Sequence, residues 1–320
     1  DILIHYYLKL PVTKGKYMFV EYVYAVIIGL LIGSFLNVVA LRTPKRMAWQ
    51  WRREALDYLE IPDATYQQLI DTKQVIPEDE NLLLDGSDGE TLSQPPGVVK
   101  KRSHCFSCGN TISWYDNIPV LSYLFLRGKC RHCKTRISLQ YPLVELASGA
   151  LALCAVAKFG LSYEAVALYA FFAVCLVLTV IDFRTQLLPD DIVLPALWGA
   201  LLWTIVAPMV GANAITPVQA LLGASIGYLI LWSVFWAFKL TTGKEGMGYG
   251  DFKLLALIGA FLGPSYLLGT LVVATVVGLV VGVILLKQKG ESQPFAFGPY
   301  LALGGILCAM FSHVSFIQIP

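Results

Sequence analysis

Charged residues are scarce in this sequence of 320 residues. Lys, Arg, Asp and Glu together make up only 14% of the chain, hydrophobic residues make up 56%, and the mean hydropathy is +0.63. Soluble domains carry about 25% charged residues, so the composition excludes an ordinary soluble protein. The net charge of +2 gives no sign of a nucleic-acid partner, and none is expected. The composition predicts an integral membrane protein.

Histidine is also rare, and the chain lacks an obvious nucleophile. The four histidines, His5, His104, His132 and His313, lie outside the group of polar residues expected at one membrane face, and no serine or cysteine nucleophile with a suitable base is visible. Hydrolysis of the Ser–His or Cys–His type is therefore not supported. Catalysis, if present, has to use other polar groups.

The fold class that we expect is an all-α polytopic membrane protein with about eight transmembrane helices. A membrane-spanning helix needs about 17 to 25 mostly apolar residues. The first apolar segment lacks a small-residue cleavage site, so we interpret it as a span and not as a signal peptide. The predicted spans lie near 18–40, 142–159, 164–181, 192–210, 218–238, 252–263, 265–286 and 299–314, of which 252–263 and 299–314 are short.

A long polar insert divides the chain. The predicted units are 1–40, the N-terminal tail and first transmembrane helix; 41–141, the insert; and 142–320, the transmembrane core. An acidic stretch within 60–98 is expected to be a solvated excursion. The alternative is that it guides a basic substrate segment electrostatically.

Positive charges indicate which way the protein faces. Arg42, Lys45 and Arg46 follow the first span directly, whereas the loop at 211–217 carries no Lys or Arg. Because Lys and Arg accumulate in cytosolic loops, the insert is predicted to be cytosolic.

The insert contains two C-x-x-C pairs, Cys105 with Cys108 and Cys130 with Cys133. Four thiolates at this spacing are typical of a tetrahedral zinc site, and a closed site of four thiolates is structural because it leaves no open position for water. A disulfide is disfavoured by the reducing cytosol, and a redox role by the lack of a surrounding βαβ pattern. We expect packing roles for the three remaining cysteines, Cys154, Cys175 and Cys308.

Two aspartates lie where long apolar segments meet polar loops. Asp182 follows the apolar stretch 165–181, and Asp251 follows a glycine-rich stretch. A carboxylate beside a membrane span is a functional candidate by default. Two spans separate the aspartates, so they are expected on the same membrane face, which is also the face of the insert if all the predicted spans are real. As a pair sharing one proton, they could activate water for hydrolysis.

Each aspartate also has a structural explanation. Arg184 could neutralise Asp182, and Lys253 could pair with Asp251. Gly248 and Gly250, beside Asp251, could supply unusual backbone conformations or allow close approach of a helix or peptide. A phosphate-binding loop is disfavoured because no strand precedes these glycines.

These motifs, in this order, resemble the bacterial type IV prepilin peptidases, the bifunctional leader peptidases and N-methyltransferases of pilus and type II secretion systems. Gly248, Gly250 and Asp251 form a G-x-G-D motif, and both C-x-x-C pairs are present. The other matching stretches are GSFLNVV at 33–39, NIP at 117–119, YPLVE at 141–145, LLPD at 187–190, GKEGMGYGDFK at 243–253 and FGPY at 297–300.

The resemblance implies a function and a set of partners. Asp182 and Asp251 would be the catalytic pair, supported by Gly248 and Gly250. The enzyme would cut the basic leader from type IV prepilins or type II secretion pseudopilins after a glycine, at the cytosolic side of the bacterial inner membrane. It would then methylate the new N-terminal amine from S-adenosylmethionine, with residues that the sequence does not identify. Lipid would be a further partner, and a homo-oligomer is left open.

Two other classes of function compete with this interpretation. A non-catalytic secretion scaffold, docking partners through its zinc module, would keep processing intact in Asp182→Asn and Asp251→Asn. A transporter could use the two acids as a proton relay. Relays normally place acids near the membrane midplane at broken helices, whereas these acids lie at span ends.

Overall fold

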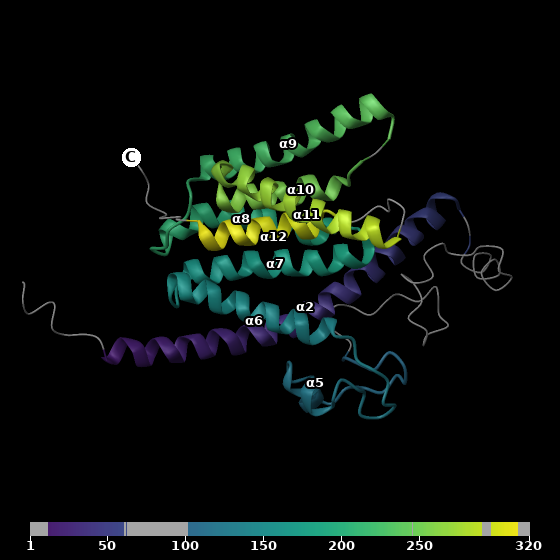
Figure 1. Ribbon diagram of the computed structural model, residues 1–320, viewed down its shortest axis with the longest axis vertical. Helices are drawn as coiled ribbons and strands as arrows, with labels where there is room; N and C mark the ends of the chain where they lie inside the picture. The colour runs from purple at the N-terminus through teal and green to yellow at the C-terminus, as the bar shows by residue number, and fades with distance from the viewer. Residues whose placement is uncertain (1–11, 61, 63–101, 245, 290–295, 313–320) are drawn as a thin grey trace, which may run out of the picture.

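The computed structural model describes residues 12–60, 62, 102–244, 246–289 and 296–312, and within them the chain is helical (Figure 1). No strand occurs in this part of the chain, only two isolated β-bridges. The all-α prediction is therefore confirmed. The elements are α2 (Val12–Tyr58), η1 (Trp114–Asn117), α5 (Leu121–Phe125), α6 (Gln140–Phe159), α7 (Tyr163–Thr185), α8 (Asp190–Met209), α9 (Pro217–Thr242), α10 (Tyr249–Leu262), η2 (Pro264–Tyr266), α11 (Leu267–Lys289) and α12 (Gly298–Phe311).

Every predicted span corresponds to a helix, but the helices differ in length. Six of those in the described residues are long and apolar enough to cross a membrane, namely α2, α6, α7, α8, α9 and α11. The two segments that were short in the sequence, α10 and α12, form helices of 14 residues each. The protein is thus a multi-pass membrane protein in which two shorter helices complete the bundle.

The first helix is much longer than predicted. α2 continues without interruption to Tyr58 and contains 47 residues, which is about 70 Å at 1.5 Å per residue. Its far end extends past the other helices (Figure 1). The predicted boundary at residue 40 thus falls inside a continuous helix, and the three-unit division stays a prediction. Most of the acidic stretch within 60–98 lies outside the described residues.

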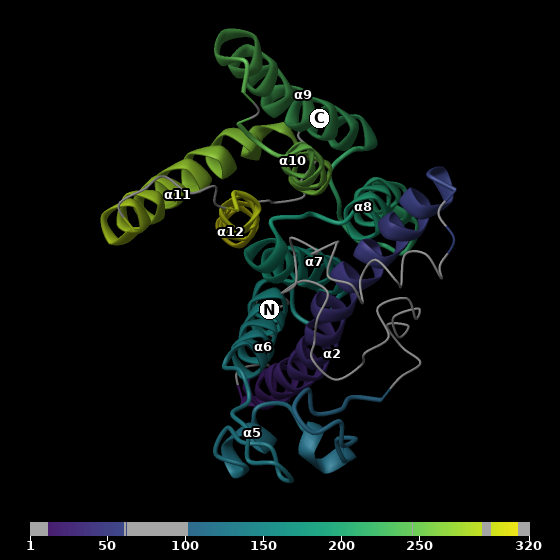
Figure 2. The same ribbon diagram turned by 90° about the vertical axis from the view of Figure 1, so that its right-hand side faces the viewer.

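The helices that carry the two aspartates lie in the interior. α7 packs against α2, α6, α8 and α12, and α10 packs against α8, α9 and α12, an arrangement seen nearly end-on in Figure 2. Ten of the 14 residues of α10 are buried. α9 and α10 approach closely because Gly223 and Gly259 face each other, and a Cβ on either would overlap the backbone of the other.

The chain path brings the insert and both aspartates to one end of the bundle. We call residues 102–139, which hold the four-cysteine cluster, the cysteine module. It leads directly into α6, and α7 runs back toward it from Tyr163 to Thr185. Asp182, in the last turn of α7, therefore lies at the module's end of the bundle. This agrees with the expectation that the acids and the insert share a face.

Candidate functional site

Asp182 is a buried acid at an unfavourable helix position. It lies in the last turn of α7 with 4% of its surface exposed. The helix ends at Gln186, which has a left-handed conformation (φ 54°) and donates its N–H to the Asp182 carbonyl oxygen at 2.9 Å. A helix C-terminus disfavours negative charge. In the described part of the chain, Oδ2 of Asp182 is buried without a well-aligned hydrogen bond, and the backbone N–H of Gly298 approaches the carboxylate.

Asp251 approaches from another helix. It lies in the first turn of α10 with 7% of its surface exposed, where the helix dipole favours a negative charge. The start of α10 lies near the end of α7, because Leu188 lies against the Cβ position of Gly250, next to Asp251, and against that of Gly298, which faces Oδ2 of Asp182. Helices separated by 63 residues or more in the sequence thus bring together the two acids that the sequence singles out.

Two glycines allow three segments to converge on the acids. A Cβ on Gly298, the first residue of α12, would lie 2.5 Å from Oδ2 of Asp182 and 3.1 Å from Cδ1 of Leu188. A Cβ on Gly250 would lie 2.7 Å from Cβ of Leu188. Leu188 therefore fills the space between the start of α10 and the start of α12. The sequence alone predicts no role for Gly298 or Leu188, although they lie in the stretches FGPY at 297–300 and LLPD at 187–190.

The two glycines of the G-x-G-D motif differ in their surroundings. Gly250 is required by its contact with Leu188, whereas the nearest atom to a Cβ on Gly248 would be Oδ2 of Asp251 at 3.9 Å. Gly248 has an extended backbone (φ −80°, ψ 145°), which any residue can adopt. Of the two expected explanations, close approach accounts for Gly250, and unusual conformation does not apply to Gly248. The space beside Gly248 adjoins Asp251 itself.

The charged neighbours do not neutralise the acids. Arg184 is exposed, and the described residues show no ion pair between it and Asp182. Lys253 donates to both carboxylate oxygens of Asp190 at 2.7 Å, linking α10 to α8. The alternative that Lys253 pairs with Asp251 is therefore not supported.

The four cysteines of the module form one cluster. The sulfur atoms of Cys105, Cys108, Cys130 and Cys133 all lie within 4.8 Å of one another, and none is in a disulfide. Sγ of Cys105 lies 3.7 Å from Sγ of Cys133. Tetrahedral zinc with Zn–S bonds of about 2.3 Å requires sulfur–sulfur distances of about 3.8 Å, so the donor set and its spacing fit zinc.

The two C-x-x-C pairs lie in the same type of turn. The backbone N–H of Cys105 donates to the carbonyl oxygen of Asn110 at 2.9 Å, and that of Cys130 donates to the carbonyl oxygen of Thr135 at 2.8 Å. The residue after each pair has a positive φ, 68° at Gly109 and 60° at Lys134. Glycine fits this conformation and lysine is strained in it. The cluster is thus built from two copies of one turn.

An ion pair joins the second turn to the rest of the module. Arg131 donates from Nε to Oδ2 of Asp116 at 2.7 Å and from a terminal nitrogen to Oδ1 at 2.5 Å. These hydrogen bonds lower the pKa of the Asp116 carboxyl. Because the folded pKa is lowered, the pair stabilises the module above the ordinary pKa of aspartate, and this contribution is lost as the pH falls through the lowered value.

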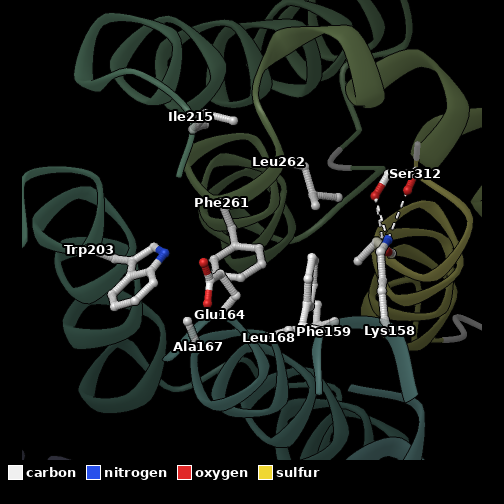
Figure 3. A pocket seen from close by; sticks show the side chains of 11 residues that line it. Lys158, Phe159, Glu164, Ala167, Leu168, Trp203, Ile215, Phe261, Leu262 and Ser312 are labelled. Carbon is white, nitrogen blue, oxygen red and sulfur yellow. Dashed lines mark hydrogen bonds between the residues drawn. The ribbon is translucent and has the colours of Figure 1, made fainter. Parts of the chain in front are cut away.

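A cavity lies at the opposite end of the bundle from Asp182 (Figure 3). Lys158 donates to the carbonyl oxygens of Ala309 at 2.6 Å and Ser312 at 2.9 Å, which closes the last turn of α12. Glu164, also on its wall, accepts the N–H of Asn213 at 2.9 Å. It lies in the first turn of α7, about 27 Å along the helix from Asp182. Both charged groups serve the fold.

Comparison with known proteins identifies the family. The profile described as the bacterial peptidase A24 N-terminal domain matches residues 27–159, and the profile described as the type IV leader peptidase family matches residues 169–283. The first match contains the cysteine module, and the second contains both aspartates. No solved structure gives a significant match to the chain.

Curated relatives cover most of the chain. A prepilin leader peptidase/N-methyltransferase of Xanthomonas campestris pv. campestris is 42% identical over 281 residues, which is 87% of each protein. Proteins of the same name from Pseudomonas putida, 43% identical over 288 residues (89% of each), and Pseudomonas aeruginosa, 42% identical over 282 residues (88% of this chain and 87% of the relative), are similar throughout. The chain therefore belongs to the type IV leader peptidase family, which confirms the prediction of a membrane peptidase. The relatives are also named for N-methyltransferase activity.

Proposed function

We propose that this protein cuts the basic leader from type IV prepilins or type II secretion pseudopilins after a glycine, with Asp182 and Asp251 as the catalytic acids. One observation carries the proposal. Two buried carboxylates, at the end of α7 and the start of α10, lie in the part of the bundle where Leu188 fills the space between Gly250 and Gly298, and the Cβ position of Gly298 is 2.5 Å from Oδ2 of Asp182. Family membership supplies the substrate class.

The pair would work as a general acid and a general base. Two neighbouring carboxylates do not both ionise easily, so they share one proton. The ionised carboxylate takes a proton from water while the oxygen of that water attacks the scissile carbonyl carbon. The protonated carboxyl group donates its proton to the carbonyl oxygen. Breakdown of the tetrahedral intermediate breaks the C–N bond, and the leaving amine takes a proton from the pair. The products are the leader's new carboxylate and the mature N-terminus.

The position of the acids suits this substrate. They lie at the module's end of the membrane bundle, where a basic leader would meet an apolar transmembrane segment. The space beside Gly248 next to Asp251 would allow a peptide backbone to approach the acid. We place this end at the cytosolic side of the bacterial inner membrane, in line with the positive charges that follow the first span.

We further propose that the same protein methylates the new N-terminal amine with S-adenosylmethionine as methyl donor. Relatives that match most of the chain carry this activity in their name. Cys105, Cys108, Cys130 and Cys133 would hold a structural zinc ion. When bound, zinc would tie the two turns of the module together, and no step of the peptidase reaction passes through it. We assign no residue to methyl transfer.

A product analysis tests the proposal. The purified protein in vesicles is incubated with a synthetic prepilin that has a basic leader, a glycine and an apolar helix, with and without S-adenosylmethionine. Mass spectrometry should show cleavage after the glycine in both cases, and one added methyl group on the new N-terminus only with the methyl donor. A substrate whose glycine is replaced by valine is the control. Cleavage elsewhere, or a methyl group on uncut substrate, would contradict the proposal.

A further inference from the structure

The cysteine module exposes an apolar surface. Leu121, Leu124 and Phe125 lie three and four positions apart on α5 and so share one face. The adjoining η1 contributes Trp114. We call these four residues the α5 surface. All four are exposed, Phe125 to 84% and Trp114 to 76%. An apolar surface of this kind usually meets a partner or a membrane.

A hydrogen bond fixes the depth of the α5 surface. Val120, which precedes α5, donates its N–H to Oε2 of Glu145 at 2.8 Å. Glu145 lies five residues into α6, so α5 begins about 7.5 Å along a membrane-spanning helix from its start. Val120 has a φ of 60°, which is strained for a β-branched residue. The bond to the carboxylate therefore holds α5 at the level of the second turn of α6.

The module lies beside the bundle and not across its end. In Figure 1, α5 lies next to the start of α6, and in Figure 2, seen nearly along the helices, the module is outside α2 and α6. No other labelled helix covers it in either view. α5 therefore lies on the outer side of the bundle, level with the second turn of α6.

The charge of the module matches an anionic lipid surface. Residues 102–139 contain one acid, Asp116, which pairs with Arg131, and five further basic residues, Arg102, Arg127, Lys129, Lys134 and Arg136. The module stays positive even with the net charge of about −2 that four thiolates around Zn²⁺ would carry. Anionic headgroups attract such clusters at about 1 kcal/mol per basic residue near the surface. Tryptophan beside apolar residues is typical of the headgroup region. Apolar depth and basic charge together are the features of an interfacial membrane anchor.

We propose that the α5 surface inserts into the lipid leaflet at the module's end of the bundle, with the basic residues of the module at anionic headgroups. The module is then held in the membrane interface at two points, through α6 and through α5. The bilayer is the occupant that depth and charge favour. The apolar helix of a prepilin is the competing occupant. The proposal concerns contact with lipid and does not depend on the proposed peptidase reaction.

Photo-crosslinking tests the contact in the full-length protein. The photoreactive residue p-benzoylphenylalanine replaces Phe125 in protein reconstituted in vesicles of phosphatidylethanolamine and phosphatidylglycerol. Leu143, exposed in the first turn of α6, is the lipid-facing control, and Tyr58, exposed at the far end of α2, is the solvent control. Unchanged melting temperatures establish that the three variants are folded.

Position 125 should form lipid adducts about as often as position 143 and about tenfold more often than position 58. Phosphatidylglycerol should be enriched among the adducts at position 125 relative to position 143. A lipid yield at position 125 no higher than at position 58 would overturn the proposal. Replacement of the lipid adduct by a substrate adduct when synthetic prepilin is added would overturn it as well, in favour of a substrate-docking surface.

Discussion

Replacing Gly298 with alanine perturbs the acid pair without changing either acid. The added Cβ would lie 2.5 Å from Oδ2 of Asp182, whereas ordinary contact begins at 3.4 Å. The carboxylate therefore has to move by about 0.9 Å, because α12 is held at its other end by the hydrogen bonds of Lys158. Misplacing a catalytic group by about 1 Å can reduce the rate about 100-fold, which corresponds to about 2.7 kcal/mol of transition-state stabilisation.

The assay is cleavage of synthetic prepilin by protein in vesicles, with kcat and KM determined separately. We expect Gly298→Ala to lower kcat/KM about 100-fold, mainly through kcat. The melting temperature should fall as well, because overpacking costs about 1–3 kcal/mol, so cleavage is measured well below the melting temperature of the variant. Gly199→Ala in α8 is the matched control, because no atom beyond the neighbouring backbone of α8 lies within 4 Å of its Cβ. A folded Gly298→Ala protein within about threefold of wild type would refute the assignment of Asp182 Oδ2 to the reaction.

Three further predictions concern the surroundings of the two sites. Gly250→Ala should lower the free energy of unfolding by about 1–3 kcal/mol, because its Cβ would lie 2.7 Å from Leu188. Gly248→Ala should keep the wild-type melting temperature. Equal melting temperatures of the two variants would contradict the packing argument. Lys134→Gly should stabilise the zinc-loaded protein against urea by about 1 kcal/mol, because glycine adopts the positive φ at this position without strain. Gly109→Ala at the equivalent turn should destabilise the protein by a similar amount. Stability changes of the same sign would count against the repeated turn. The Lys253→Ala protein should cleave at a rate within about threefold of wild type and lose at most about 1 kcal/mol of stability, because Lys253 pairs with Asp190 at 2.7 Å. A loss of cleavage as large as that from changing Asp182 or Asp251 would show that Lys253 acts on these two acids.

The helices of the fold could be predicted because a membrane-spanning helix requires a continuous segment of about 20 apolar residues, which is easily recognised in a sequence. Each predicted apolar segment forms a helix, and this includes the two short ones, α10 and α12. The continuation of α2 to Tyr58 could not be predicted from apolar length, since residues 41–58 are rich in charged and polar side chains. The end of α2 extends past the other helices, so the apolar pattern of a membrane span does not continue to it (Figure 1).

The candidate site was only partly predictable for a different reason. Asp182 and Asp251 stand out because charge is costly beside an apolar segment. Pairing depends on tertiary structure, and proximity along the chain was misleading for Lys253, which bonds to Asp190 on α8. Glu145 lies in a quoted motif, but its bond to Val120 joins segments whose approach the sequence does not reveal.

The most direct test of the catalytic pair is cleavage of synthetic prepilin by wild type, Asp182→Asn and Asp251→Asn. Asp191→Asn, an exposed acid in the first turn of α8, is the matched control. If the pair activates water, both buried-acid variants lose cleavage with unchanged circular dichroism, and Asp191→Asn keeps it. Cleavage by both buried-acid variants at the wild-type rate would contradict the aspartic mechanism and favour a scaffold.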